Sequence, residues 1–266
     1  MSAGLRVERD GPFVRVILAR PEVRNAFNAE LIGELHEAFE RLAETPAAET
    51  LRGIVLAGEG PVFSAGADVG WMRGAIGLSI EDNERDAAAM QAMFAAIDAS
   101  PVPVIARVQG AALGGGMGLC AVSDVVIATE DATFGFTETK LGIIPAVIST
   151  FVLPKVGETH ARALFATGQR FDADRALRIG LVHEVVADEA AMDARLAGLL
   201  EELRSAGPSA ARAAKALVRD LRGLDPAEAG KHTVRAIARQ RTSSEGQDGL
   251  RAFIDKGPPP WRDGSA

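Results

Sequence analysis

The chain has 266 residues, 47% of them hydrophobic and 24% charged, which is typical of a globular protein that buries a sizeable core. Its net charge of −7 and lack of a basic run argue against a general nucleic-acid binder, and its single cysteine, Cys120, excludes an internal disulfide framework. Residues 1–10 do not resemble a signal peptide, and no run of about eighteen apolar residues predicts a membrane span, so we expect a cytoplasmic protein.

Strands and helices are expected to alternate along most of the chain. An Asp10-Gly11 turn predicts a hairpin of strands at 5–8 and 13–18, and Asn28 is a suitable N-cap for a helix running to about Glu44. The later predictions are a strand at 51–57, an irregular stretch at 69–78, a helix at 80–97, strands at 102–108, 124–128 and 132–136, helices at 146–153, 157–167 and 172–179, a strand at 181–186, and helices from 188 onward. Strands joined by helices indicate the α/β class.

Two glycine-containing stretches stand out within this pattern. Gly114, Gly115 and Gly116 follow an apolar, strand-like run and precede a helix-compatible segment, an arrangement that points free N–H groups at an anion. The stretch 63–68 (Phe-Ser-Ala-Gly-Ala-Asp) also follows a strand-like run and exposes backbone through small residues. Two N–H donors from separate loops are what a developing thioester enolate requires.

The order and spacing of four stretches resemble the enoyl-CoA hydratase/isomerase (crotonase) family over nearly the whole chain. They are 20–26, 63–68, 110–116 and 134–145. The resemblance implies an α/β fold in which ββα units form a spiral core over residues 1–200, with a C-terminal helical region over 201–266 that builds a homotrimer or a dimer of trimers. It also implies an acyl-CoA ligand and no separate cofactor, since coenzyme A is part of the substrate. No metal, nucleic-acid or membrane partner is expected.

The resemblance also assigns roles to individual residues. Ala67 and Gly115 match the positions whose backbone N–H groups form the oxyanion hole, and Glu138 matches the carboxylate that transfers the proton. Apolar neighbours of Glu138 would raise its carboxyl pKa toward the working pH. Contacts to the substrate or to CoA are expected from Arg24, Ala26, Ala65, Asp68, Gly114, Gly118, Pro145, Phe253 and Lys256. For Asp68, a structural role at the end of its loop is favoured over contact with the ligand.

The chain departs from the best-known hydratases at one position. Those enzymes carry a second glutamate where this chain has Gly118, which excludes a mechanism using a carboxylate there. Hydration of a 2-enoyl-CoA, a Δ3,Δ2-enoyl-CoA isomerase reaction with one glutamate, and thioester hydrolysis therefore stay open. The stretch 138–149 is similar to bacterial methylglutaconyl-CoA hydratases, which favours hydration. The methylglutaconyl group carries a free carboxylate, so binding it would require a nearby cation. Lys140 and Arg73 are the candidates for that cation.

Three other readings compete with an acyl-CoA enzyme. The stretch 116–121 fits a dinucleotide-binding fingerprint, but the following strand-like run begins after too few residues for a crossover helix, which argues against an NAD-dependent oxidoreductase. The stretch 63–66 resembles a serine nucleophile elbow, but Val62 replaces its first glycine. A non-catalytic trimeric scaffold is supported only by the missing second glutamate.

Overall fold

The structure is a computed structural model and describes residues 4–44 and 50–262, so the outer ends of the predicted ranges 1–200 and 201–266 lie outside the described residues. Its strands are β1 (Leu5–Asp10), β2 (Phe13–Leu18), β3 (Gly53–Gly58), β4 (Val104–Val108), β5 (Ala111–Leu113), β6 (Val125–Thr129), β7 (Thr133–Gly135), β8 (Arg170–Asp172) and β9 (Glu184–Val186). Its helices are α1 (Ala29–Ala43), α3 (Val69–Gly74), α4 (Ile80–Asp98), α5 (Gly115–Val122), α6 (Ala146–Thr167), α7 (Ala173–Arg178), α8 (Glu189–Ser205), α9 (Pro208–Asp220), α10 (Pro226–Thr242) and α11 (Ser244–Ile254), with short 3-10 turns η1 (Pro21–Val23), η2 (Thr137–Leu141) and η3 (Pro260–Arg262).

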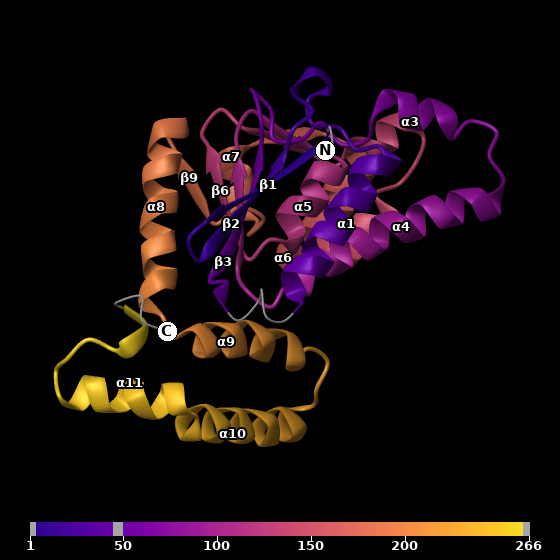
Figure 1. The fold of residues 1–266 in the computed structure, drawn as a ribbon. Helices are drawn as coiled ribbons and strands as arrows, with labels where there is room; N and C mark the ends of the chain where they lie inside the picture. Colours follow the sequence, from indigo (N-terminus) through magenta and orange to yellow (C-terminus); the bar gives the residue numbers. More distant parts are fainter. Residues whose placement is uncertain (1–3, 45–49, 263–266) are drawn as a thin grey trace.

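The central strands of the main sheet are buried on both faces, whereas the edge strand β1 is largely exposed. The strand order of the sheet is β1-β2-β3-β4-β6-β9, parallel throughout except for the antiparallel β1–β2 hairpin at one edge. Successive residues of a strand face opposite sides, so Ile54 and Leu56 enter the larger core while Val55 between them enters a smaller one. Helices α1, α4, α5 and α6 supply the larger core, and α8 covers the other face through Met192 and Leu196 (Figure 1).

A second, small sheet carries the glycine-rich segment. Its order is β5-β7-β8, with β5 parallel to β7 and β8 antiparallel to it. Strand β5 lies between the end of β4 and the start of α5, where the sequence indicated only a turn. The segment from β4 to β6 nevertheless makes a parallel crossover, because β5 and α5 together span it. The prediction that the chain has too few residues for a crossover helix before the strand at 124–128 is therefore wrong.

Several other boundaries differ from the prediction. Residues 69–74 form α3 rather than an irregular stretch, because the Asp68 side chain caps the helix by accepting hydrogen bonds from the N–H groups of Gly70 and Trp71. The predicted break between helices 146–153 and 157–167 is confirmed, because α6 is interrupted at Gly157, whose backbone (φ +72°) is not helical. The last strand is shorter than expected. Asn28 caps α1 as predicted.

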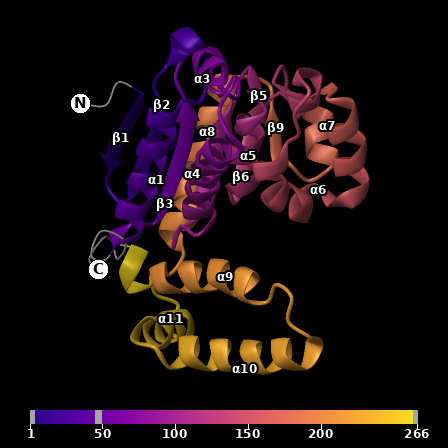
Figure 2. The same cartoon turned by 90° about the vertical axis from the view of Figure 1, so that its right-hand side faces the viewer.

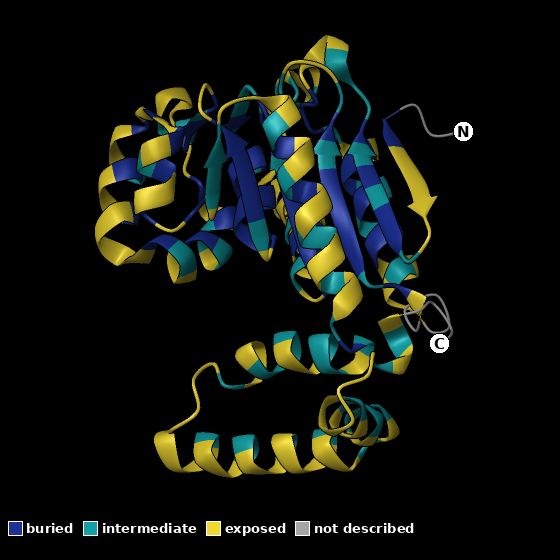
Figure 3. Ribbon diagram, turned by 90° about the vertical axis from the view of Figure 1, so that its left-hand side faces the viewer, coloured by how far each residue is buried: buried dark blue, intermediate teal, exposed yellow. Residues whose placement is uncertain are grey.

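The last three helices form an arm below the core (Figures 1 and 2). The predicted boundary at residue 200 falls inside α8, and the chain leaves the core only after Ser205. None of the residues in α9, α10 and α11 is buried, in contrast to the core helices (Figure 3). Within the described ranges, no helix combines the length and apolar composition needed to cross a bilayer.

Candidate active site

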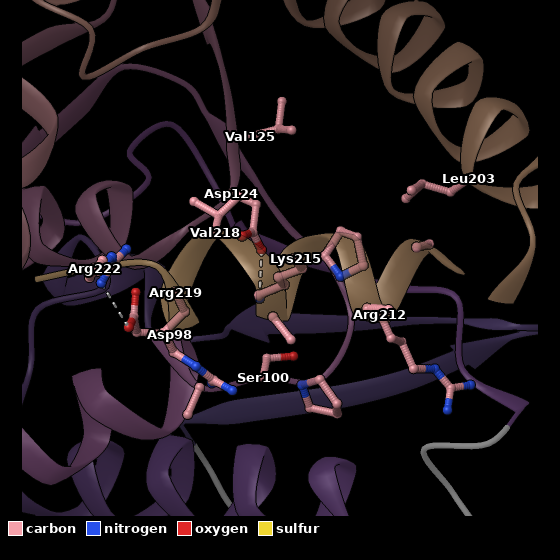
Figure 4. A pocket seen from close by; sticks show the side chains of 16 residues that line it. Asp98, Ser100, Asp124, Val125, Leu203, Arg212, Lys215, Val218, Arg219 and Arg222 are labelled. Atoms are coloured by element: carbon pink, nitrogen blue, oxygen red, sulfur yellow. Dashed lines mark hydrogen bonds and ion pairs between the residues drawn. The ribbon is translucent and has the colours of Figure 1, made fainter. Parts of the chain in front are cut away.

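Two cavities of nearly equal volume are candidates for the functional site, so we compare the chemical groups that line them. One, of about 680 Å³, lies between α9 and the core (Figure 4). Four of its charged side chains pair with one another, as Lys215 lies 2.7 Å from Asp124 and Arg222 lies 3.9 Å from Asp98. The other, of about 670 Å³, is lined by both small-residue loops and by Glu138. We therefore take the second cavity as the candidate active site.

The two loops at this cavity interlock through their backbones. The Ser64 N–H donates to the Ala111 carbonyl at 3.0 Å, and the Leu113 N–H donates to the Ser64 carbonyl at 3.0 Å. Gly66 has φ +91°, and a Cβ built on it would lie 2.8 Å from the Leu113 carbonyl oxygen. Only glycine allows this close approach, so the sequence here sets the spacing of the two loops.

The two predicted donors are free to bind a ligand. Within residues 4–44 and 50–262, neither the Ala67 N–H nor the Gly115 N–H donates a hydrogen bond to the protein. Gly115 is the first residue of α5, so the helix dipole adds to the partial positive charge of its N–H. Both residues line the cavity. The arrangement suits an oxyanion that develops on a bound carbonyl group.

Helix α5 is held at its other end by a partly buried lysine. The Lys155 ammonium group donates to the carbonyls of Cys120, at 3.2 Å, and Ser123. A cation at the C-terminus of a helix stabilises it and satisfies carbonyls that have no partner within the helix. Burial raises the pKa of the Cys120 thiol to about 12, so this cysteine is no nucleophile at neutral pH.

Glu138 is the acidic group that faces the donors. It lies in η2, and its Oε1 would be 3.4 Å from a Cβ built on Gly114, the residue just before the Gly115 donor. Burial raises the pKa of Glu138, and a hydrogen bond from its own backbone N–H offsets this only in part. Its Oε2 is buried and has no partner among the described residues. A buried carboxyl with a free oxygen and a raised pKa is suited to transferring protons.

An ion pair fixes the loop that carries Ala67. Arg20 donates to Asp68 Oδ2 at 2.9 Å and to the Ala26 carbonyl at 2.6 Å. Burial alone would raise the pKa of Asp68, but the hydrogen bonds from Arg20 and from the start of α3 hold it below its usual value. This confirms a structural role for Asp68. Sequence reasoning did not single out Arg20, although it opens one of the four family stretches.

Arg24 lies in the same loop with an uncommon backbone conformation. Both Arg24 (φ +55°) and Asn25 (φ +53°) adopt the left-handed region, which is rare for residues other than glycine. Asn25 is fully buried and its side chain donates to the carbonyls of Glu59 and Val62. These bonds hold the turn, and they leave Arg24 exposed at the surface.

The position of the missing second glutamate is filled by apolar side chains. A Cβ built on Gly118 would lie 2.5 Å from Phe94 Cζ and 2.6 Å from Ile148 Cγ2. Phe94 and Ile148 are themselves buried. Gly118 does not line the cavity, so the expectation that it contacts the substrate is not met: α4 and α6 close over it.

The cavity brings together part of the predicted set. Among the predicted residues, those lining it are Ala65, Ala67, Gly114, Gly115, Glu138 and Pro145, whereas Arg24, Ala26, Asp68, Gly118, Phe253 and Lys256 do not. Phe253 is 83% exposed on the arm. Sequence reasoning missed Trp71 and Asp86 on the cavity wall. The helical spacing of Ala87 and Met90 could have indicated that this face of α4 turns toward the site.

The dinucleotide fingerprint has no room for its ligand. Gly116 and Gly118 lie inside α5, and a Cβ on Gly116 would meet the Ser64 carbonyl oxygen at 2.8 Å. These glycines serve close packing within the protein. The two backbone N–H groups and the Glu138 carboxyl line one cavity instead, and together they make it a candidate acid–base site for a ligand with a polarisable carbonyl group.

Comparisons with known proteins identify the family of the chain. The family model described as Enoyl-CoA hydratase/isomerase matches residues 9–264, and the chain belongs to that family. The crotonyl-CoA hydratase of Syntrophomonas wolfei is 33% identical over 254 residues, which cover 94% of each chain. The crystal structure of an enoyl-CoA hydratase from Shewanella pealeana has a TM-score of 0.92 at 36% identity, covering 98% of this chain and 96% of that one. Pseudomonas aeruginosa AtuE has a TM-score of 0.93 at 38% identity, covering 97% and 99%. The predicted crotonase fold is thereby confirmed.

Proposed function

We propose that this protein adds water to the double bond of a 2-enoyl-CoA thioester to give a 3-hydroxyacyl-CoA. The observation that carries the proposal is the position of Glu138, whose carboxyl lies beside the loop that presents the Gly115 N–H. The hydratase names of the relatives support the same reaction. The reaction needs no cofactor, because coenzyme A belongs to the substrate.

In the proposed mechanism the thioester oxygen accepts hydrogen bonds from the N–H groups of Ala67 and Gly115. Ionised Glu138 takes a proton from water, and the resulting hydroxide adds to C3 while the electrons of the double bond move toward the thioester oxygen. The two donors stabilise the enolate, each by about 3–4 kcal/mol. Protonated Glu138 then returns its proton to C2, so that one carboxyl performs both transfers.

A Δ3,Δ2-enoyl-CoA isomerase reaction is the second candidate, because a single carboxyl can also move a proton between two carbons. An assay pair separates the two reactions. Loss of the conjugated enoyl absorbance with crotonyl-CoA indicates hydration, and gain of absorbance with a 3-enoyl-CoA indicates isomerisation. Release of free CoA would indicate the thioester hydrolase alternative, and no turnover of any of them would favour a scaffold.

Arg24 is proposed to bind a phosphate of CoA, because it is exposed and lies in a turn that the side-chain hydrogen bonds of Asn25 hold in place. We expect Arg24→Ala to raise the KM for a CoA thioester about tenfold, a loss of about 1.4 kcal/mol, with kcat little changed. Arg41→Ala, an exposed arginine on α1, is the matched control. Steady-state kinetics at low and high salt check this. A fall in kcat with unchanged KM would contradict a binding role.

The arm is proposed to join three copies of the chain, or six as a dimer of trimers, and to bring Phe253 and Lys256 toward a CoA site. Exposed apolar residues on α10, such as Val234 (67%) and Ile237 (50%), support an interface, since residues three apart share a face. We expect Val234→Glu with Ile237→Glu to shift the mass toward the monomer in analytical ultracentrifugation. Val7→Glu, on the edge strand, is the control. A native chain that sediments as a monomer would rule the interface out.

A further inference from the structure

The wall that α4 contributes to the candidate active site carries a second acidic side chain. Asn83, Ala87 and Met90 follow one face of this helix, and Asp86 lies beside them on the same cavity. Asp86 has no ion-pair partner within the described ranges, and its neighbour Arg85 pairs with Asp82 instead. The Asp86 carboxylate is therefore in no ion pair among these residues, and the basic side chain that shares a cavity with it is His36, which borders the smaller cavity beside Trp71.

The charged side chains that line the cavity all have the same sign. Among the described residues that line it, Glu138 and Asp86 are acidic and none is Lys, Arg or His. Lys140 and Arg73, the cations that an acidic acyl chain would need, are exposed and do not line the cavity. Most of the remaining wall is apolar, including Trp71, Ile143 and Ile144. A negative group inside this cavity would meet two acids and no cation.

Asp86 lies on the part of α4 away from Phe94, the residue that packs against Gly118. It precedes Phe94 by eight residues, which is about 12 Å along a helix. Phe94 packs against Gly118 in α5, the helix that begins with the Gly115 donor. Asp86 and Trp71 also border a smaller cavity of about 290 Å³. This position suits contact with the distal part of an acyl chain and does not suit replacement of the missing second glutamate.

We propose that the acyl site selects uncharged acyl chains and that Asp86 is the residue that excludes chains ending in a carboxylate. The inference rests on the proposed function, because it assumes that the acyl group of a CoA thioester enters this cavity. Asp86 is half-buried, and repulsion between like charges is stronger beside apolar surface than in open water, so its carboxylate disfavours a second one in this cavity. A 3-methylglutaconyl chain, which the sequence suggested, belongs to the excluded class.

Binding of unreactive thioesters tests the selectivity separately from catalysis. Glutaryl-CoA and its terminal amide have the same shape and differ in charge, and titration calorimetry on the full-length protein gives both dissociation constants. We expect the native protein to bind the amide at least tenfold more tightly than glutaryl-CoA. Asp86→Asn should reduce that ratio to within threefold, while Glu84→Gln, an exposed acid on α4, should leave it unchanged.

The two dissociation constants test whether Asp86 excludes acyl chains that end in a carboxylate. Equal affinity of the native protein for the two thioesters would overturn it, and so would a preference that survives in Asp86→Asn. Because neither thioester has a double bond to hydrate, the selectivity can hold even if no 2-enoyl-CoA is hydrated. In that case the proposed reaction fails while the assignment of Asp86 stands. If crotonyl-CoA is hydrated but the two thioesters bind equally, the proposed reaction stands and the assignment of Asp86 fails.

Discussion

Replacement of Glu138 by glutamine is expected to lower the rate of crotonyl-CoA hydration by about 10³-fold or more, because the amide can neither take nor return the proton. The variant keeps the size of the side chain, so the affinity for the substrate should change little. The exposed Glu130 supplies the control, and Glu130→Gln should retain full activity. Hydration by Glu138→Gln at the native rate would remove this residue from the mechanism.

The same variant should raise the thermal stability at neutral and alkaline pH. Burial raises the pKa of Glu138 in the folded protein, so its ionised form is favoured in the unfolded chain. The native protein therefore has its full stability below the ordinary glutamate pKa of about 4.3 and loses part of it as the pH rises through the higher folded pKa. Glutamine removes this loss, so the Tm gain should be present at pH 8 and absent near pH 4.

A pH profile of the native enzyme gives an independent check. Glu138 must be ionised to accept the proton of water, so kcat/KM should fall as the pH decreases through the raised pKa of this group. The inflection should therefore lie above the ordinary glutamate range. An inflection at or below about pH 4.3 would place the essential ionisation on a different, unburied carboxylate.

The parts of the site that were predictable from the sequence depend on local backbone requirements. Gly66 and Gly114 occupy conformations that favour glycine, and Gly115 begins a helix directly after a short strand. Such requirements leave a pattern within a few residues, which is why both loops were predicted to expose backbone donors. Glu138 followed from its place in the family pattern, and its burial was expected from the apolar residues after it.

The parts that were not predictable depend on residues distant in the sequence. Gly118 appeared to face the ligand, but side chains from α4 and α6 cover it, and no local signal indicates which helices will cross there. Asp86 lies in a helix whose existence was predicted, yet its orientation toward the cavity depends on how α4 packs against α1 and α5. The helical state of 69–74 required the capping contact of Asp68, a residue that was expected to fix the end of its loop but not to begin a helix.

Restoring the missing carboxylate through Gly118→Glu is expected to disrupt the protein rather than to improve it as a hydratase. The first atom of the new side chain would lie 2.5 Å from Phe94 Cζ and 2.6 Å from Ile148 Cγ2, closer than carbon atoms can approach. Overpacking of a core costs about 1–3 kcal/mol, and a buried carboxylate without a partner adds to that cost. Thermal unfolding should show a lower Tm, and hydration of crotonyl-CoA should decrease.

Two further variants separate the steric effect from the effect of charge. Gly118→Ala adds only the clashing carbon, so it should lower the Tm less than glutamate does. Phe94→Ala combined with Gly118→Glu removes one of the two obstructing side chains and should recover part of the Tm lost in Gly118→Glu. If Gly118→Glu alone folds with the native Tm and hydrates crotonyl-CoA faster, then the wall formed by Phe94 and Ile148 yields to a carboxylate. In that case the absence of a second carboxyl would limit the rate of hydration by the native chain.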